Sequence, residues 1–437
     1  MKEKQFLTAL FLFIFSWIVA QNQEVKELEK FLSTQDDLIY NQLPTSDGEP
    51  LRYELRVKQP VDWKNPKEGY FFQRVILTHV GFDRPTLIET QGYQIYDHKN
   101  ELQQILNSND LNVEHRYFGE SKPDSIDWKY LNLYNVAHDL HHINRIFRKI
   151  YKKDWISTGI SKGGQTTIYY RYFFPDDVNV SIPYVTPINY TLEDKRIYNF
   201  LENVGTLECR QKIKDFQIFM LKNEDEALKY VQSYAETKGL TFNYLGSIGK
   251  SFEYSVFEYS FSFWQWGYSC NQIPQSEDVS HAVDYLMLNS GVDFFSDQEI
   301  NNYASHYYQA ATEMGYYGYD IQPFKKYLHH LNGDANPLAT FAPKEAGVVQ
   351  YNEELNNKLK IWLETQANNI IYIYGGNDTW SATKVVPSPQ TNSVILELPG
   401  ANHASARIEN MNETLKNQLS NVLYDWIHLR PDYSLLK

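Results

Sequence analysis

The chain has 437 residues, a formal net charge of −13 and 42% hydrophobic residues. This length can bury a large core and could hold two domains. No basic cluster stands out in this acidic chain, which argues against nucleic acid as a partner.

Residues 1–20 have the pattern of a cleaved signal peptide. Lys2 and Lys4 precede an apolar run from Phe6 to Ala20, and polar residues follow. About 15 apolar residues fall short of the roughly 20 that a membrane-spanning helix needs, which disfavours the alternative of an anchor. There is no cysteine near the predicted cleavage site, so a lipid anchor is not expected. We predict export to the periplasm or the extracellular space, without stable membrane insertion after cleavage.

The chain contains two cysteines, Cys209 and Cys270. In an exported protein a disulfide between them is the economical interpretation, and two buried thiols are the alternative.

Residues 21–189 predict the first part of an α/β domain. Leu51–Val57 is expected to form an edge strand, and a helical spacing of apolar residues covers residues 132–152. Further strands are expected at residues 70–80, 85–93, 111–116, 154–160 and 180–185. A second helix is expected at residues 163–173. Strands that alternate with helices indicate a mostly parallel sheet.

Residues 190–335 differ, with helical periodicity, dense aromatic residues and no strand–helix alternation. Strand patterns resume at residues 370–374 and 393–398, and a helix is expected at residues 408–429. We therefore predict a helical cap at 190–335, inserted into an α/β core that resumes at 336–437.

Gly159-Ile160-Ser161-Lys162-Gly163 follows a predicted strand and precedes a predicted helix. This is the G-x-S-x-G pattern of a nucleophile elbow, in which a serine occupies a strained turn between strand and helix. The flanking glycines allow the strand and the helix to approach closely. The pattern also arises by chance, so Ser161 as a nucleophile requires support from the rest of the chain.

Asp378 and His403 follow the next two predicted strands, in the order that an α/β hydrolase requires. His403 would take the proton from Ser161, and Asp378 would hold the imidazole in one tautomer. The alternatives are a turn or helix-capping residue for Asp378 and a surface histidine for His403. Three matches in the correct order favour a serine hydrolase.

The oxyanion hole is predicted to use the backbone amide of Lys162 and that of Gly92 or Tyr93, after the third predicted strand. A simple turn glycine is the alternative for Gly92. A Ser–Lys dyad is disfavoured, because adjacent residues across an elbow point apart. His138 and His142 share a helix face but do not complete a H-E-x-x-H zinc motif. The predicted chemistry requires neither a metal nor a cofactor.

Several segments together resemble secreted bacterial serine tripeptidyl aminopeptidases with proline preference. These segments are Glu114–Ser121, Ser161–Gly164, Gly205–Arg210, Phe263–Gly267, Tyr308–Tyr316 and Asn377–Ala382. The first segment and that around Tyr308 are also similar to the lysosomal Pro-Xaa carboxypeptidases and dipeptidyl peptidases. The resemblance covers nearly the whole mature chain, and Thr379 departs from it where a proline is expected. It implies a capped α/β-hydrolase fold, the triad Ser161, Asp378 and His403, and release of short peptides from N-termini.

An exopeptidase of this kind needs a fixed anion for the free α-ammonium group of its oligopeptide substrate. Glu253, Glu258 and Glu313 lie among aromatic residues in the predicted cap. Buried carboxylates persist where they are paired or functional, so an internal partner is the alternative for each. Glu258 and Glu313 are preferred, because both lie in the segments that resemble the family or next to them.

The sequence therefore predicts an exported serine exopeptidase that forms an acyl-enzyme. A carboxylesterase or lipase on the same fold is a second hypothesis, since fold and triad alone do not exclude it. A non-catalytic surface-binding protein that keeps a hydrolase shell is a third, and the intact triad argues against it.

Overall fold

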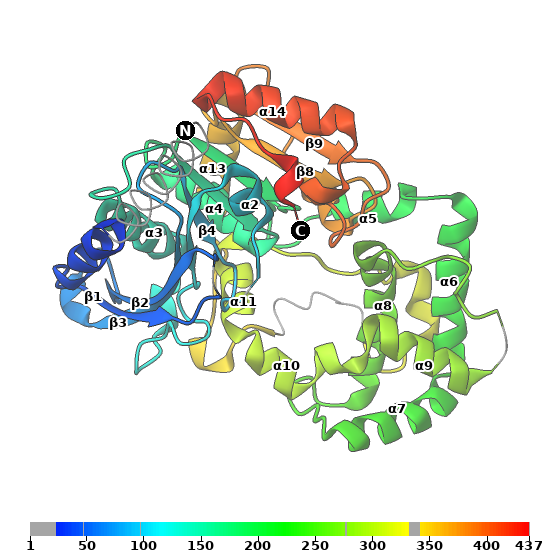
Figure 1. Cartoon of the computed structure of the whole chain (residues 1–437). Coiled ribbons are helices and arrows are strands. Elements are labelled where there is room, and N and C mark those ends of the chain that lie inside the picture. The colour runs from blue at the N-terminus through cyan, green and yellow to red at the C-terminus, as the bar shows by residue number, and fades with distance from the viewer. Residues whose placement is uncertain (1–22, 47, 97, 276–277, 332–340, 437) are drawn as a thin grey trace.

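The computed structural model describes residues 23–46, 48–96, 98–275, 278–331 and 341–436 (Figure 1). The predicted signal peptide lies outside these ranges. The strands are β1 (Leu38–Leu43), β2 (Leu51–Pro60), β3 (Tyr70–His79), β4 (Thr86–Thr90), β5 (Asn109–Val113), β6 (Trp155–Ile160), β7 (Val180–Tyr184), β8 (Ile371–Gly375) and β9 (Val394–Leu398). The helices are α2 (Glu101–Leu106), α3 (Leu133–Phe147), α4 (Lys162–Phe173), α5 (Arg196–Asn203), α6 (Leu207–Lys222), α7 (Glu224–Lys238), α8 (Ile248–Trp266), α9 (Val279–Ser290), α10 (Asp297–Asn302), α11 (Ala304–Gln309), α13 (Glu353–Thr365) and α14 (Glu413–Ile427).

The strands form one sheet in the order β1-β2-β3-β5-β4-β6-β7-β8-β9. Neighbouring strands are antiparallel from β1 to β5 and parallel from β5 to β9. Parallel neighbours need crossover connections, which helices supply. The arrangement confirms the predicted α/β-hydrolase fold.

One strand prediction was wrong. Leu51–Val57 belongs to β2, which lies between β3 and a further strand, β1, at the edge of the sheet. In β1 only Leu38 is buried and the remaining side chains are partly or fully exposed. The period-two alternation that reveals a half-buried strand is therefore weak there.

Helices cover both faces of the sheet, and β8 shows how the sequence achieves this. Ile371 and Ile373 pack with α2 and α14 on one face, whereas Tyr372 and Tyr374 pack with α4 and α13 on the other. A strand that is buried on both faces reads as a continuous apolar run, as this one does.

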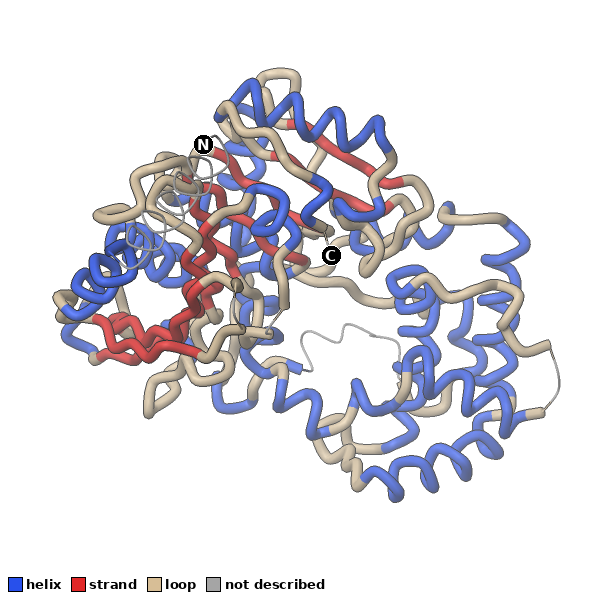
Figure 2. Tube along the Cα trace, viewed as in Figure 1, coloured by secondary structure: helices blue, strands red, loops and turns tan. Residues whose placement is uncertain are grey.

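Helices α5 to α11 lie between β7 and β8 in the chain and share a hydrophobic cluster separate from those of the sheet. In Figure 1 helices α6 to α9 stand together at the lower right, away from the sheet. Figure 2 shows the strands, in red, in the part of the molecule away from helices α6 to α9. In the described ranges, no helix combines the length and the apolar character needed to cross a membrane.

Candidate active site

Ser161 sits on the turn between β6 and α4, with φ 57° and ψ −120°. Such a conformation costs a non-glycine residue about 1–3 kcal/mol and persists only where the surroundings enforce it. Here the Ser161 amide donates to Tyr184 O at 2.9 Å. A Cβ on Gly159 would lie 2.4 Å from Gly163 O, and one on Gly163 would lie 2.5 Å from Thr90 O. Both flanking glycines are therefore required by close backbone approach.

Asp378 and His403 lie together at the edge of the sheet formed by the carboxyl ends of β8 and β9. The two strands are parallel with Gly375 opposite Leu398, so their following loops leave the same edge. Asp378 is fully buried, and its Oδ2 lies 2.8 Å from His403 Nδ1. Its Oδ1 accepts the Trp380 amide at 3.1 Å. A carboxylate accepts, so Nδ1–H donates and Nε2 is left as the basic nitrogen.

The loop that carries His403 is also held by the end of α8. The His403 amide donates to Gln265 O at 2.9 Å, and Asn402 Nδ2 donates to Trp266 O at 2.9 Å. The Trp266 ring meets the His403 ring edge to face, with centroids 6.0 Å apart. The position of the imidazole thus depends on the helical region as well as on the sheet.

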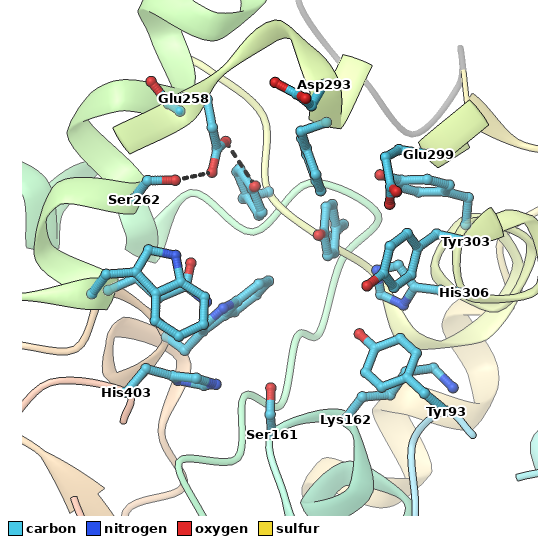
Figure 3. A pocket seen from close by; sticks show the side chains of 18 of the residues that line it. Tyr93, Ser161, Lys162, Glu258, Ser262, Asp293, Glu299, Tyr303, His306 and His403 are labelled. Carbon is cyan, nitrogen blue, oxygen red and sulfur yellow. Dashed lines mark hydrogen bonds between the residues drawn. The ribbon is translucent and has the colours of Figure 1, made fainter. Parts of the chain in front are cut away.

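Ser161 and His403 line one cavity of about 720 Å³ (Figure 3). Its walls come from both the sheet loops and the helical region, and they carry many aromatic side chains. Among these are Tyr93, Trp266, Tyr303, Tyr307, Tyr316 and Trp380. Three acidic residues also line it: Glu258, Asp293 and Glu299.

Glu258 is buried in the wall of this cavity. Its carboxylate accepts hydrogen bonds from Ser262 Oγ at 2.9 Å, Tyr317 OH at 2.8 Å and Tyr319 OH at 2.7 Å. Burial raises the pKa of Glu258 to about 7, although the three hydroxyl donors act in the opposite direction. All three donors are neutral, and Glu258 forms no ion pair with any residue that the structure describes.

The other two glutamates predicted from the sequence lie elsewhere, which corrects the expectation for Glu313. Glu313 Oε2 accepts the Leu133 amide at 2.6 Å at the start of α3, and Glu313 is not part of the cavity wall. Glu253 accepts the amides of residues 329–331 at 2.6–2.9 Å. Both carboxylates bind backbone amides, the internal-partner alternative for such residues.

Gly92 and Tyr93 follow β4 and lie against the first residues of α4. A Cβ on Gly92 would be 2.6 Å from Lys162 Cβ and 2.7 Å from Gly163 N. The predicted oxyanion residues Lys162, Gly92 and Tyr93 are therefore brought together. The Lys162 side chain is buried and donates to Gly92 O and to Gln309 Oε1, each at 2.7 Å.

Other residues are placed as follows. Cys209 and Cys270 form a disulfide. His138 Nδ1 lies 2.8 Å from Tyr134 O, and His142 Nδ1 lies 2.9 Å from Gln59 Oε1. Within the described ranges, no group of three or more His, Cys, Asp or Glu side chains could hold a metal ion.

Several residues of the cavity carried no sequence signal. Asp293 lies in the connection after α9 and Glu299 on α10, and Asn289 comes from α9. Their local sequences match those of ordinary polar helix and turn residues. Only the packing of the helical region directs them into the cavity.

The chain has a nine-stranded sheet, a serine on a strained strand–helix turn, and in the same cavity a histidine whose ring is held by a buried aspartate. These features define an α/β hydrolase with a serine nucleophile. The family model described as PS-10 peptidase S37 matches residues 41–434. The chain is also 30% identical over 360 residues to the prolyl tri/tetrapeptidyl aminopeptidase of Streptomyces mobaraensis, covering 80% of this chain and 75% of that protein. The chain belongs to the PS-10 peptidase S37 family, and it is a serine peptidase.

Solved structures with similarity include the proline iminopeptidase of Mycobacterium smegmatis, with 13% identity and a TM-score of 0.36. That match covers 88% of this chain and 97% of the other. A prohormone-processing carboxypeptidase of Saccharomyces cerevisiae is 11% identical with a TM-score of 0.39, covering 83% of this chain and 89% of the other.

Proposed function

We propose that this peptidase releases short peptides, mainly tripeptides that end in proline, from free N-termini. Ser161 attacks the scissile carbonyl while His403 Nε2 takes its proton, and Asp378 stabilises the imidazolium. The leaving amine receives that proton, and water then hydrolyses the acyl-enzyme by the same route. The amide of Lys162, with that of Gly92 or Tyr93, stabilises the oxyanion.

The observation that carries the exopeptidase assignment is Glu258, a buried carboxylate in the wall of the Ser161 cavity that forms no ion pair with any described residue. An ionised carboxylate has about four acceptor sites, and three are already occupied by hydroxyl donors. One site remains for an ammonium group. A substrate α-ammonium would supply the missing positive charge.

An ammonium group has three N–H donors and therefore needs acceptors besides Glu258. Asn289 lines the same cavity, and its buried Oδ1 has no hydrogen-bond partner. Helices α8 and α9 pack together, with Ser290 Oγ donating to Ser255 O at 2.9 Å. Ser255 and Glu258 are three residues apart on α8, so Glu258 lies about one helical turn along α8 from the point where Ser290, the neighbour of Asn289, contacts that helix. We assign Asn289 Oδ1 as the second acceptor.

The helical region at 190–335 acts as a cap in this proposal. Its residues form much of the cavity wall, so a folded protein could not reach Ser161, whereas an oligopeptide could enter. The aromatic side chains near Ser161 suit a proline ring, which packs well on flat apolar surfaces. The prolyl specificity in the name of the Streptomyces relative agrees with this choice.

The test is a panel of chromogenic peptides of two to five residues that end in proline or alanine, each with a free or an acetylated N-terminus. We expect the free proline tripeptide to be cleaved fastest and acetylation to lower kcat/KM by about 100-fold, the effect of leaving one buried charge unpaired. The variant Ser161→Ala is the blank. Equal cleavage of free and acetylated peptides would contradict the exopeptidase assignment, and activity on p-nitrophenyl esters alone would indicate an esterase.

We also propose that the protein is exported and cleaved after Ala20. A disulfide persists in oxidising compartments, so the Cys209–Cys270 bond supports this localisation. N-terminal sequencing of the protein recovered outside the cytoplasm should begin at Gln21. Recovery of the intact N-terminus in the cytoplasm would contradict export.

A further inference from the structure

We propose that the Lys162 side chain is a positioning residue, which orients the Gly92–Tyr93 peptide group so that the Tyr93 amide becomes the second oxyanion donor. The inference rests on the acyl-transfer function proposed for Ser161. The sequence predicts a role only for the backbone amide of Lys162, and this inference adds a role for its side chain. It also decides between Gly92 and Tyr93.

The first observation is the setting of the Lys162 ammonium group. Lys162 is 2% exposed, and its Nζ donates to Gly92 O and to Gln309 Oε1 at 2.7 Å each. Its Nζ also lies 5.3 Å and 4.9 Å from the ring centroids of Tyr93 and Phe118. Burial holds the pKa of Lys162 well below its ordinary range. A buried lysine held only by neutral groups is costly, which indicates a purpose other than stability.

The second observation concerns the peptide group that this ammonium binds. The described part of the chain contains no cis peptide bond, so the Gly92 carbonyl and the Tyr93 N–H point in opposite directions from one plane. Because Lys162 Nζ holds the carbonyl, it also fixes the direction of the N–H. The Tyr93 carbonyl is held separately, by the His115 amide at 3.0 Å. Among the described residues the amides of Gly92 and Tyr93 both lack a protein acceptor, and the Tyr93 amide is the one whose direction Lys162 fixes.

The third observation is the closeness of the two proposed donors. The loop at Gly92 touches the backbone of Lys162 and Gly163, where a Cβ on Gly92 would come within 2.6–2.7 Å. Figure 3 shows Tyr93 and Lys162 beside Ser161, on the side of the cavity away from His403. A donor on that side would reach the oxyanion, while His403 serves the other side of Ser161.

A cation at the carbonyl also strengthens the amide as a donor. Hydrogen bonds in series polarise one another, so an ammonium bound to Gly92 O makes the Tyr93 N–H more positive. Gln309 is the last residue of α11 in the helical region. Through Gln309 and Gly92, one ammonium therefore connects the cap with the oxyanion loop.

The test is Lys162→Met, which keeps the backbone amide and the apolar stem but removes the ammonium group. We expect kcat on a free proline tripeptide to fall about 10- to 100-fold, part of the loss seen when an oxyanion donor is removed. KM should change less than about 3-fold, because the oxyanion exists only in the transition state. A peptide boronate, which forms a tetrahedral adduct with Ser161, should lose affinity by the same factor as kcat/KM. The melting temperature should change little, because removal of a buried charge offsets the loss of the hydrogen bonds to Gly92 O and Gln309 Oε1.

The matched control is Lys153→Met, an exposed lysine before β6, which should keep wild-type kinetics. The second measurement replaces the Tyr93 amide by an ester through incorporation of the α-hydroxy analogue of tyrosine. It should lower kcat about 100-fold in the wild type and much less in Lys162→Met. Wild-type kcat in either variant would overturn the inference, as would a Lys162→Met protein whose KM and melting temperature change while kcat does not. The preference for free over acetylated N-termini should persist in both variants. Absence of that preference in the wild-type protein would refute the proposed function but not this inference.

Discussion

At the scale of single residues, Glu258 and Lys162 are buried ionisable groups in the cavity wall that form no ion pair with any described residue. Burial raises the pKa of Glu258 and lowers that of Lys162, so the charged form of each is disfavoured in the free protein. A substrate that supplies an ammonium to the first and an oxyanion near the second reverses both penalties. In the proposed function, substrate binding and the transition state would therefore favour the charged forms that burial disfavours.

Glu258→Gln is expected to change how stability depends on pH. The folded-state pKa of Glu258 is about 7, above its ordinary value of 4.5, so the stabilisation from its protonated form is present below pH 4.5 and lost as pH rises towards 7. The glutamine variant does not undergo this loss, which corresponds to about 3 kcal/mol for a fully buried group. The melting temperature of the variant relative to wild type should therefore rise between pH 5 and pH 8. Thermal unfolding at both pH values measures this, and a constant difference would contradict it.

Asn289→Leu is expected to weaken recognition of the free N-terminus. It removes the unpaired Oδ1 with little change in volume, and a hydrogen bond to a charged group contributes about 1.5–3 kcal/mol. The ratio of kcat/KM for free over acetylated tripeptides should fall about 10-fold or more. Leu288→Ala, at an exposed position of the same helix, is the control. An unchanged ratio would remove Asn289 from the anchor.

At the scale of elements, the end of helix α8 holds the loop of His403, the proposed catalytic base. Helix α8 ends at Gly267 in the left-handed conformation, and the last carbonyls of a helix lack intrahelical donors. Gln265 O and Trp266 O obtain donors from His403 and Asn402 instead. Satisfying the helix end and positioning the imidazole are thus one set of contacts.

Asn402→Asp tests this connection. The aspartate can still accept the amides of Ala404 and Ser405, which shape the loop, but it cannot donate to Trp266 O. We expect kcat to fall about 10-fold through loss of one hydrogen bond and repulsion between oxygens, with little change in the far-UV circular dichroism spectrum. Asn271→Asp, at an exposed position, should behave as wild type. Normal kcat in Asn402→Asp would show that Gln265 O alone holds the loop.

At the scale of the whole molecule, the sheet and the helical region have separate hydrophobic clusters and share the cavity. The disulfide lies entirely in the helical region, between α6 and the segment after α8. It therefore stabilises the part of the chain that carries Glu258 and Asn289 rather than the sheet.

The double variant Cys209→Ser, Cys270→Ser should be less stable by about 4 kcal/mol, because the bond closes a loop across a sequence separation of 61 residues. Urea denaturation followed by tryptophan fluorescence measures the loss. Wild-type protein treated with a reducing agent should show the same shift, and the variant should not respond. Identical midpoints for variant and wild type would contradict a stabilising disulfide.

Local patterns determined the elements and the positions of the proposed triad. The elbow needs small residues at Gly159 and Gly163 because backbone atoms lie where a Cβ would be, and this requirement is visible in five consecutive residues. The Ile-Tyr-Ile-Tyr run of β8 likewise reveals a strand buried on both faces. Asp378 and His403 could be predicted because chain order and strand ends identify them.

The tertiary structure alone decided which glutamate faces the cavity and what the Lys162 ammonium binds. Glu253, Glu258 and Glu313 all lie among aromatic residues, and only packing shows that two bind backbone amides while Glu258 faces the cavity. Lys162 reaches Gln309, 147 positions away in the chain. Such contacts depend on how the helical region lies over the sheet, which no local spacing of residues encodes. The sequence by itself predicted the triad Ser161, Asp378 and His403, and the packing of distant segments determined which other groups line the cavity and what the Lys162 side chain binds.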